Sequence, residues 1–246
     1  MKIVLSFFLS VLFYTQLLGQ ETISFNSSDG LEITVDLYMP HEKSAPFIVL
    51  FHQANWSRGE YIEIAPKLNA MGYNCMAVDQ RSGGSANEIR NMTKAGASRA
   101  MKGTSYVDAL PDVIAAIEYA KNNLTEGKLM IWGSSYSSSL VLKVAGDSPD
   151  LVDAVLAFSP GEYFSNLGKP KDWITTSAKQ ISIPVFITSS RNEKMNWWKI
   201  YESIPSVNKH YFLPTTSGNH GARALWEKFS DSKDYWTAID EFLDSI

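Results

Sequence analysis

The sequence has little cysteine, little histidine and no run of positive charge. Its 246 residues include one cysteine, four histidines and a formal net charge of −4. A single cysteine, Cys75, excludes an internal disulfide, and the absence of a Lys/Arg run argues against nucleic acid as a partner. No His/Asp/Glu cluster has the spacing of metal ligands, so we expect no metal site.

Long apolar stretches are also scarce, and only the N-terminus carries one that approaches a membrane span. Met1-Lys2 precedes an apolar stretch over 3–18, and Gly19-Gln20 follows it. This pattern predicts a secretory signal peptide over 1–19, cleaved near Gly19/Gln20, and a secreted or periplasmic protein without stable membrane association after cleavage. An uncleaved membrane anchor is the alternative.

The rest of the chain alternates between strand and helix patterns. Residues 31–38 alternate between apolar and polar after a hairpin signal that follows 23–26, whereas 47–51 form a continuous apolar run of the kind buried on both faces. Similar runs predict strands over 74–78, 128–132, 152–158, 184–188 and 210–213, and helical periodicity marks 61–71, 107–122 and 235–246. This alternation predicts an α/β fold with a mostly parallel sheet, helices on both faces, and one domain over 20–246.

A serine cluster follows the strand predicted over 128–132. Residues 133–139 read Gly-Ser-Ser-Tyr-Ser-Ser-Ser, and a helical pattern follows. In a nucleophile elbow the positions two before and two after the serine must be small, because strand and helix pack closely there. Ser135 has Gly133 and Ser137 at those positions and directly follows the strand, so we select it as the nucleophile of a serine hydrolase. Ser137 stands where a second glycine is usual.

Polar residues also follow the other strands of the predicted sheet. His52-Gln53 follow Phe51, Asp79 follows Val78, and the acid Glu193 and then His220 come after the last two strands. Ligands of open parallel sheets bind beyond the carboxyl ends of the strands. The chain order Ser–acid–His is the order expected for this fold.

The chain resembles the α/β-hydrolase family, and more closely its dienelactone-hydrolase-like members. The resemblance rests on five motifs in order: Leu50-Phe-His-Gln53, Gly72-Tyr73 with Ala77-Val-Asp79-x-Arg81-x-Gly83-Gly84, Gly133-x-Ser135-x-Ser137, Pro184-Val-Phe-Ile187 with Glu193, and Asn219-His220-Gly221. It implies a mostly parallel sheet whose second strand is antiparallel. It also implies hydrolysis of esters or related acyl bonds without a metal or organic cofactor.

The catalytic roles follow from the chemistry of the side chains. Ser135 would attack the acyl carbonyl, and His220 is the best candidate for the base that activates it. Of the other histidines, His41 lies in an early loop, His210 begins a strand, and His52 is expected to be a hydrogen-bonding prop.

Glu193 would orient the imidazole of His220, at a position where similar proteins usually carry aspartate. The other interpretation is a solvated carboxylate paired with Arg191 or Lys194. Asp79 is the rival acid, ranked lower because an Asp-x-Arg pair at that place more often braces its loop.

The oxyanion hole and the substrate pocket are predicted from neighbouring positions. The backbone N–H groups of Gln53 and Tyr136 would hold the oxyanion. Trp56, Trp173 and Trp197 would line the pocket or else cap the ends of the core. Roughly 25 residues separate Phe158 from Pro184, which leaves room for a minimal lid and favours small, accessible substrates.

The sequence therefore predicts a serine hydrolase that cleaves a small-molecule ester through an acyl-enzyme. Two alternatives stay open: a peptidase or acyltransferase of the same fold, and a non-catalytic binding protein. The second is supported by Gln53, Ser137 and Ser190, which stand where glycine is expected.

Overall fold

A twisted sheet of eight strands forms the centre of the molecule in a computed structural model, which describes residues 20–246. The predicted signal peptide over 1–19 lies outside the described residues. The strand order is β1-β2-β4-β3-β7-β8-β9-β10, and β2 alone runs antiparallel to its neighbours, as the resemblance implies. The strands are β1 (Glu21–Asn26), β2 (Glu32–Tyr38), β3 (Phe47–Phe51), β4 (Asn74–Val78), β7 (Leu129–Ser134), β8 (Ala154–Phe158), β9 (Val185–Thr188) and β10 (Lys209–Phe212).

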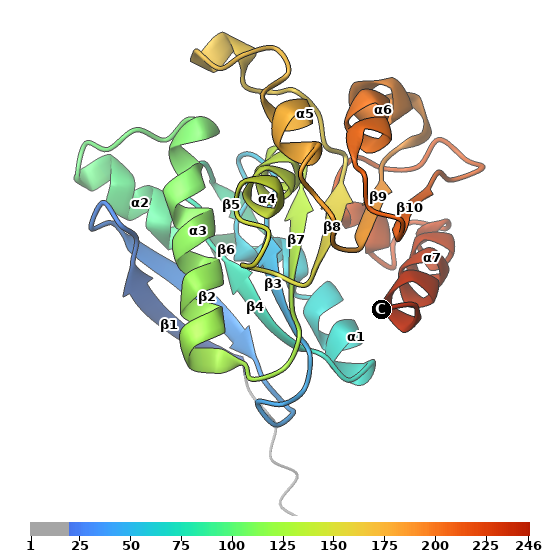
Figure 1. The fold of residues 1–246 in the computed structure, drawn as a ribbon. Helices are drawn as coiled ribbons and strands as arrows, with labels where there is room; N and C mark the ends of the chain where they lie inside the picture. The colour runs from blue at the N-terminus through green and yellow to red at the C-terminus, as the bar shows by residue number, and fades with distance from the viewer. Residues whose placement is uncertain (1–19) are drawn as a thin grey trace, which may run out of the picture.

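Helices cover both faces of this sheet, as the alternating pattern predicts (Figure 1). They are α1 (Ile64–Ala70), α2 (Met92–Arg99), α3 (Leu110–Tyr119), α4 (Tyr136–Asp147), α5 (Trp173–Ala178), α6 (Lys194–Ser203) and α7 (Ser232–Asp244). Residues of α2 to α6 join the core on one face, and residues of α1 and α7 join the core on the other. None of these helices is long and apolar enough to cross a membrane.

The continuous apolar runs are strands with two buried faces. In β3, Phe47, Val49 and Phe51 point into one core while Ile48 and Leu50 point into the other. All five side chains are fully buried. A strand covered on both faces needs apolar residues at every position, which is why the alternating pattern of an exposed strand is missing here.

Two helices, α2 and α6, were not predicted from the sequence. In α2 only Thr93 and Ala97 are buried, so almost no apolar periodicity marks it. In α6 the buried residues are Trp197 and Ile200, among lysines and other polar residues. The helix predicted over 107–122 is a short 3-10 turn, η2 (Val107–Ala109), then α3, and then one wide π turn, η3 (Ala120–Leu124).

The segment between β8 and β9 is as small as predicted. It contains one 3-10 turn, η4 (Ser165–Leu167), and α5. Both lie near the carboxyl ends of the parallel strands (Figure 1). The minimal lid leaves the loops that follow β3, β7, β9 and β10 as the main builders of any site at this edge.

Candidate active site

Ser135 occupies a strained turn between β7 and α4. Its φ and ψ angles are 59° and −125°, a region that side-chain-bearing residues seldom adopt. A Cβ atom on Gly133 would lie 2.5 Å from the main chain of Ser138, so position 133 requires glycine. Ser135 is partly exposed, whereas the other serines of the cluster, Ser134 and 137–139, are fully buried. These features single out Ser135 from its neighbours.

Ser137 shows how the elbow tolerates the missing second glycine. Its hydroxyl oxygen lies 2.8 Å and 2.9 Å from the carbonyl oxygens of Phe51 and His52. It also accepts the N–H of Ser134 at 2.9 Å. The extra side chain therefore fastens the elbow to the end of β3 rather than pushing the two apart.

Glu193 and His220 are joined directly. Glu193 ends the 3-10 turn η5 (Arg191–Glu193) after β9, and its Oε1 is hydrogen-bonded to Nδ1 of His220. Its other oxygen, Oε2, accepts the hydroxyl of Ser159 at 2.8 Å and the N–H of Ser190 at 3.2 Å. Burial alone would raise the pKa of Glu193. The hydrogen bond and the charge of His220, together with the hydrogen bonds from Ser159 and Ser190, outweigh burial and lower this pKa.

The neighbouring cations of Glu193 are engaged elsewhere. Arg191 donates to the carbonyl of Thr215 at 2.7 Å, and the ammonium of Lys194 lies 4.0 Å from the ring centre of Trp198. The interpretation of Glu193 as a solvated carboxylate paired with either of them therefore does not hold in this structure.

Ser159 is a part of the site that the sequence analysis missed. It follows β8, with φ of 57°, and its hydroxyl donates to Glu193 and accepts the N–H of Gly221 at 2.9 Å. The residue thus fixes both the acid and the loop that carries His220. A lone serine carries no sequence signal for such a role. Its only indication is its position directly after β8, at the edge of the sheet where the site lies.

The loop that carries His220 is attached to the elbow itself. The N–H of Ala222 donates to Oγ of Ser134 at 2.9 Å, and a Cβ on Gly221 would lie 2.5 Å from the same atom. Ala222, two residues after His220, is thus bonded to Ser134, the residue before Ser135, and this contact holds the loop of His220 at the elbow. Within residues 20–246 Ser135 and His220 share no hydrogen bond. Hydrogen bonds between a nucleophile and its base are often long before the substrate binds.

The structure corrects one of the two predicted oxyanion donors. Tyr136 is the first residue of α4, so its N–H has no acceptor within the helix. The N–H of Gln53, however, donates to Oε2 of Glu60 at 2.8 Å and is not free. The next amide, that of Ala54, donates to no acceptor within residues 20–246 and belongs to a half-buried residue. Ala54 replaces Gln53 as the second candidate donor.

Glu60 is a second group that the sequence did not mark. It lies in the 3-10 turn η1 (Arg58–Tyr61), and its side chain is fully buried. Burial raises the pKa of Glu60 to about 7, although hydrogen bonds from Gln53 and Ser134 and the charge of His220 lower it. A buried acid that titrates near neutrality is typical of functional sites.

The remaining histidines are structural. His52 is fully buried; its Nδ1 is bonded to the carbonyl of Gln53 at 2.7 Å, and its Nε2 accepts the N–H of Gln80 at 3.1 Å. Burial lowers the pKa of His52 to about 4, so it stays neutral. His41 is bonded to the carbonyl of Asn69, and His210 lies on β10 against Asn208, both away from Ser135.

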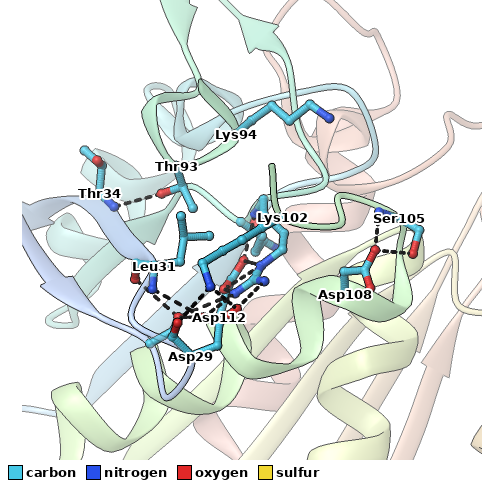
Figure 2. Close-up of polar contacts among 12 residues, drawn as sticks. Asp29, Leu31, Thr34, Thr93, Lys94, Lys102, Ser105, Asp108 and Asp112 are labelled. Carbon is cyan, nitrogen blue, oxygen red and sulfur yellow. Dashed lines mark hydrogen bonds and ion pairs between the residues drawn. The ribbon is translucent and has the colours of Figure 1, made fainter. Parts of the chain in front are cut away.

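Asp79, the rival acid, is bound to an arginine. Its Oδ2 lies 2.8 Å from Nη1 of Arg58, and its Oδ1 accepts the N–H of the same residue. Arg81 does not pair with Asp79 as the Asp-x-Arg spacing suggested. It binds Asp112 at 2.6 Å and Asp29 at 2.7 Å. Figure 2 shows Asp29 and Asp112 in a cluster of polar contacts. Both arginines brace loops.

The structure excludes one of the three tryptophans predicted for the substrate pocket. Trp197 is fully buried and donates from Nε1 to Ser189 Oγ at 2.8 Å, so it cannot line an open pocket. Trp56 stacks on Trp226, with ring centres 5.1 Å apart. Trp173 packs edge-on against Phe164 and joins the core. Trp197 therefore fills the core, whereas Trp56 and Trp173 are partly exposed and their place in the pocket stays a prediction.

A different aromatic cavity lies beside the elbow. It has a volume of about 270 Å³ and is lined by Ser105, Tyr106, Tyr163, Asn166 and Leu167. The ring of Tyr106 stacks on that of Tyr136, the residue after Ser135, with centres 4.7 Å apart. The hydroxyl of Tyr163 donates to the carbonyl of Ser159 at 2.7 Å. Two of the residues that line the cavity therefore contact the elbow and the serine that holds Glu193. No group of three or more His, Cys, Asp or Glu side chains in residues 20–246 could hold a metal ion.

Comparisons with known proteins agree with this architecture. The model of the family described as "Serine aminopeptidase, S33" matches residues 42–173. A dienelactone hydrolase from Anabaena variabilis is 13% identical with a TM-score of 0.71, and covers 92% of this chain and 97% of its own. An esterase from Pyrococcus furiosus is 15% identical with a TM-score of 0.68 and covers 93% of each chain. Est1E from Butyrivibrio proteoclasticus, solved with ferulic acid, is 12% identical with a TM-score of 0.69, covering 91% and 98%. These structures share the fold; among curated proteins, none matches the sequence.

Proposed function

Because the chain belongs to the serine aminopeptidase S33 family of α/β-hydrolases, we propose that it is a serine hydrolase that cleaves small carboxylic esters through an acyl-enzyme. Ser135 is the nucleophile, His220 the general base and acid, and Glu193 the carboxylate that orients His220.

One observation carries this proposal. The Glu193–His220 hydrogen bond sits on a loop that is bonded to Ser134, directly before the strained Ser135. An acid, an imidazole and a partly exposed serine, each from a separate strand end, thereby support the proposal. Structural packing alone gives no reason to hold Ser135 in a strained conformation.

The chemistry follows from these contacts. His220 takes the proton of Ser135 as the hydroxyl oxygen bonds to the acyl carbon, and then gives that proton to the departing alcohol. Water repeats the sequence on the acyl-enzyme and releases the acid. Glu193 accepts the Nδ1 hydrogen of His220 throughout, which fixes the tautomer and stabilises the imidazolium. The N–H groups of Tyr136 and Ala54 stabilise the oxyanion.

The cavity lined by Tyr106 and Tyr163 is assigned to the acyl group of the substrate. Its volume of about 270 Å³ suits one ring or a short chain, and its walls are two tyrosine rings and Leu167. With only η4 and α5 between β8 and β9, no large lid covers it. Small, accessible esters are therefore the proposed substrates.

A peptidase is the second candidate, favoured by the description of the matching family as a serine aminopeptidase. The same Ser135, His220 and Glu193 would act on an amide. Parallel assays of a p-nitrophenyl ester and of an aminoacyl p-nitroanilide separate the two, because the proposed enzyme hydrolyses the ester at the higher kcat/KM.

We also propose that residues 1–19 are a signal peptide, so that the enzyme works outside the cytoplasm. Support comes from the sequence alone: one positive charge, an apolar stretch and a small residue before a polar segment. N-terminal sequencing of the protein from its export compartment should begin near Gln20; an intact Met1 would contradict the proposal.

The replacement Ser135→Ala tests the proposed function directly. Hydrolysis of p-nitrophenyl acetate should fall by about 10⁴-fold or more, because the attacking hydroxyl is gone. Ser148→Ala, an exposed serine just after α4, is the matched control and should retain full activity. Unchanged ester hydrolysis by Ser135→Ala would refute the proposal, and inert wild-type protein would favour the binding-protein alternative.

A further inference from the structure

The carboxylate of Glu60 collects hydrogen bonds from the loop that follows β3. Oε2 accepts the N–H of Gln53 at 2.8 Å, and Oε1 accepts the side-chain amide of the same residue at 3.2 Å. One carboxylate thus holds both the backbone and the side chain of Gln53. This double contact fixes the His52–Gln53 peptide unit and the side chain of Gln53, directly before the peptide unit that carries the N–H of Ala54.

The same carboxylate reaches the elbow and the loop of His220. Oε1 also accepts the hydroxyl of Ser134 at 2.8 Å, and Ser134 Oγ accepts the N–H of Ala222 at 2.9 Å. The backbone carbonyl of Glu60 accepts Nε1 of Trp226 at 3.0 Å. Glu60 therefore links the ends of β3 and β7 and the segment after β10, which are the three parts of the chain that carry the proposed oxyanion donors, nucleophile and base.

No arginine or lysine within residues 20–246 forms an ion pair with Glu60. The titratable groups that face it are His220, from the loop after β10, Tyr136 from α4, and its own neighbour Tyr61. His52, on the far side of Gln53, is neutral. A buried carboxylate without a guanidinium partner is costly for folding, so its presence at this junction calls for a functional account.

We propose that Glu60 is a positioning residue whose ionised carboxylate holds the Gln53 peptide and so aims the N–H of Ala54 at the oxyanion. The inference rests on the proposed function, since it assigns Glu60 a task in the same reaction. Glu60 does not touch the substrate; it acts through Gln53 and Ser134.

Ionisation of Glu60 then becomes a second requirement for activity. A carboxylate is a stronger acceptor for the Gln53 amide than a protonated acid, which must itself donate one hydrogen. The pKa of Glu60, about 7, lies close to neutral pH. As pH falls, protonation of Glu60 therefore removes activity. The slope of the acid limb of log(kcat/KM) against pH should be greater by about one in wild type than in a variant that lacks this carboxylate.

The test compares Glu60→Gln with wild type and with Glu88→Gln, a replacement at an exposed glutamate. In Glu60→Gln, kcat for p-nitrophenyl acetate should fall about 10- to 100-fold, with KM changed less than 3-fold and the slope of the acid limb lower by about one. Glu60→Asp keeps a titrating carboxylate, so the slope of its acid limb should equal that of wild type although its rate is lower. Glu88→Gln should behave as wild type.

A second measurement needs no variant. In wild-type protein the amide resonance of Gln53 should shift with pH around a midpoint near 7, as its acceptor titrates. A flat Gln53 resonance, or a kcat and slope in folded Glu60→Gln equal to wild type, overturns the inference while the ester hydrolysis of wild type stands. Loss of the proposed function shows separately, as ester hydrolysis that survives Ser135→Ala.

Discussion

The carboxylates of two regions of the molecule differ in the groups that face them. Beside β2 and β4, Asp79 and Asp36 pair with Arg58, and Asp112 pairs with Arg81, whose side chain also binds Asp29. At the elbow, Glu60 and Glu193 face amides, hydroxyls and the imidazole of His220.

This difference distinguishes carboxylates that stabilise loops from carboxylates proposed to take part in the reaction. Arginine stays charged at every physiological pH, so a carboxylate bound to it keeps a cationic partner and stabilises its loop, although burial raises the pKa of Asp79 to about 6 and also raises that of Asp112. Within residues 20–246 Glu60 has no such partner, and burial raises its pKa to about 7. We therefore expect replacements in the first region to change stability and those in the second to change activity and its pH dependence.

The largest effect is expected at Glu193. Glu193→Gln preserves size but no longer selects the reactive tautomer of His220, and kcat should fall about 10³- to 10⁴-fold. Thermal unfolding should change little. Steady-state hydrolysis of p-nitrophenyl acetate measures the effect, with the exposed Glu202→Gln as control. A decrease in kcat of less than tenfold would indicate that Glu193 only stabilises its loop.

Asp112→Asn should break the brace instead. It leaves the buried guanidinium of Arg81 with only Asp29, which costs about 3–5 kcal/mol in the free energy of unfolding. Chemical denaturation measures this cost, with the exposed Asp150→Asn as reference. Activity per folded molecule should equal that of wild type. A selective loss of kcat without loss of stability would remove the distinction between the two regions.

Glu60→Gln should also reveal the unusual titration through stability. Burial raises the pKa of Glu60 from 4.5 to about 7. Below pH 4.5 the residue is protonated in both the folded and the unfolded protein, so burying it carries no charge penalty. The free energy of unfolding then decreases as the pH rises through the folded-state pKa of about 7. The stability of Glu60→Gln relative to wild type should therefore increase by about 2–3 kcal/mol between pH 4.5 and pH 8. A constant difference across this range would show that Glu60 does not titrate there.

The smallest effect is expected in the cavity. Tyr106→Ala removes one wall and should lower kcat/KM for p-nitrophenyl benzoate about tenfold, equivalent to about 1.4 kcal/mol. The acetate ester, too small to reach the wall, should be hydrolysed within 2-fold of wild type. Equal losses for both esters would assign Tyr106 to the support of Tyr136 rather than to the acyl pocket.

The three catalytic candidates could be predicted from the sequence because their positions depend on local pattern and on the order of elements along the chain. Gly133 and the flanking residues select Ser135 by steric limits, and the succession of buried strands puts Glu193 and His220 at the same edge. Sequence reasoning failed where loops decide the contacts. Nothing in the Arg-Gly-Glu-Tyr segment indicates that Glu60 folds inward to take the amide of Gln53, which displaced the predicted oxyanion donor.

The aromatic residues show a second limit. Trp197 lies in a helix with only two buried residues, so the sequence pattern does not indicate α6. Once the helix forms, hydrophobic burial draws the indole into the core. The cavity is lined instead by Tyr106 and Tyr163, and their position depends on stacking with Tyr136 and on a bond to the main chain of Ser159.

Mapping a fluorophosphonate adduct by mass spectrometry tests the central claim most directly. Trypsin should release Leu129–Lys143, a peptide that contains Ser134, Ser135 and 137–139, and fragmentation identifies the modified residue. We expect one phosphonyl group on Ser135, formed more slowly in Glu193→Gln. An adduct on any other serine, or no adduct in protein that hydrolyses esters, would contradict it.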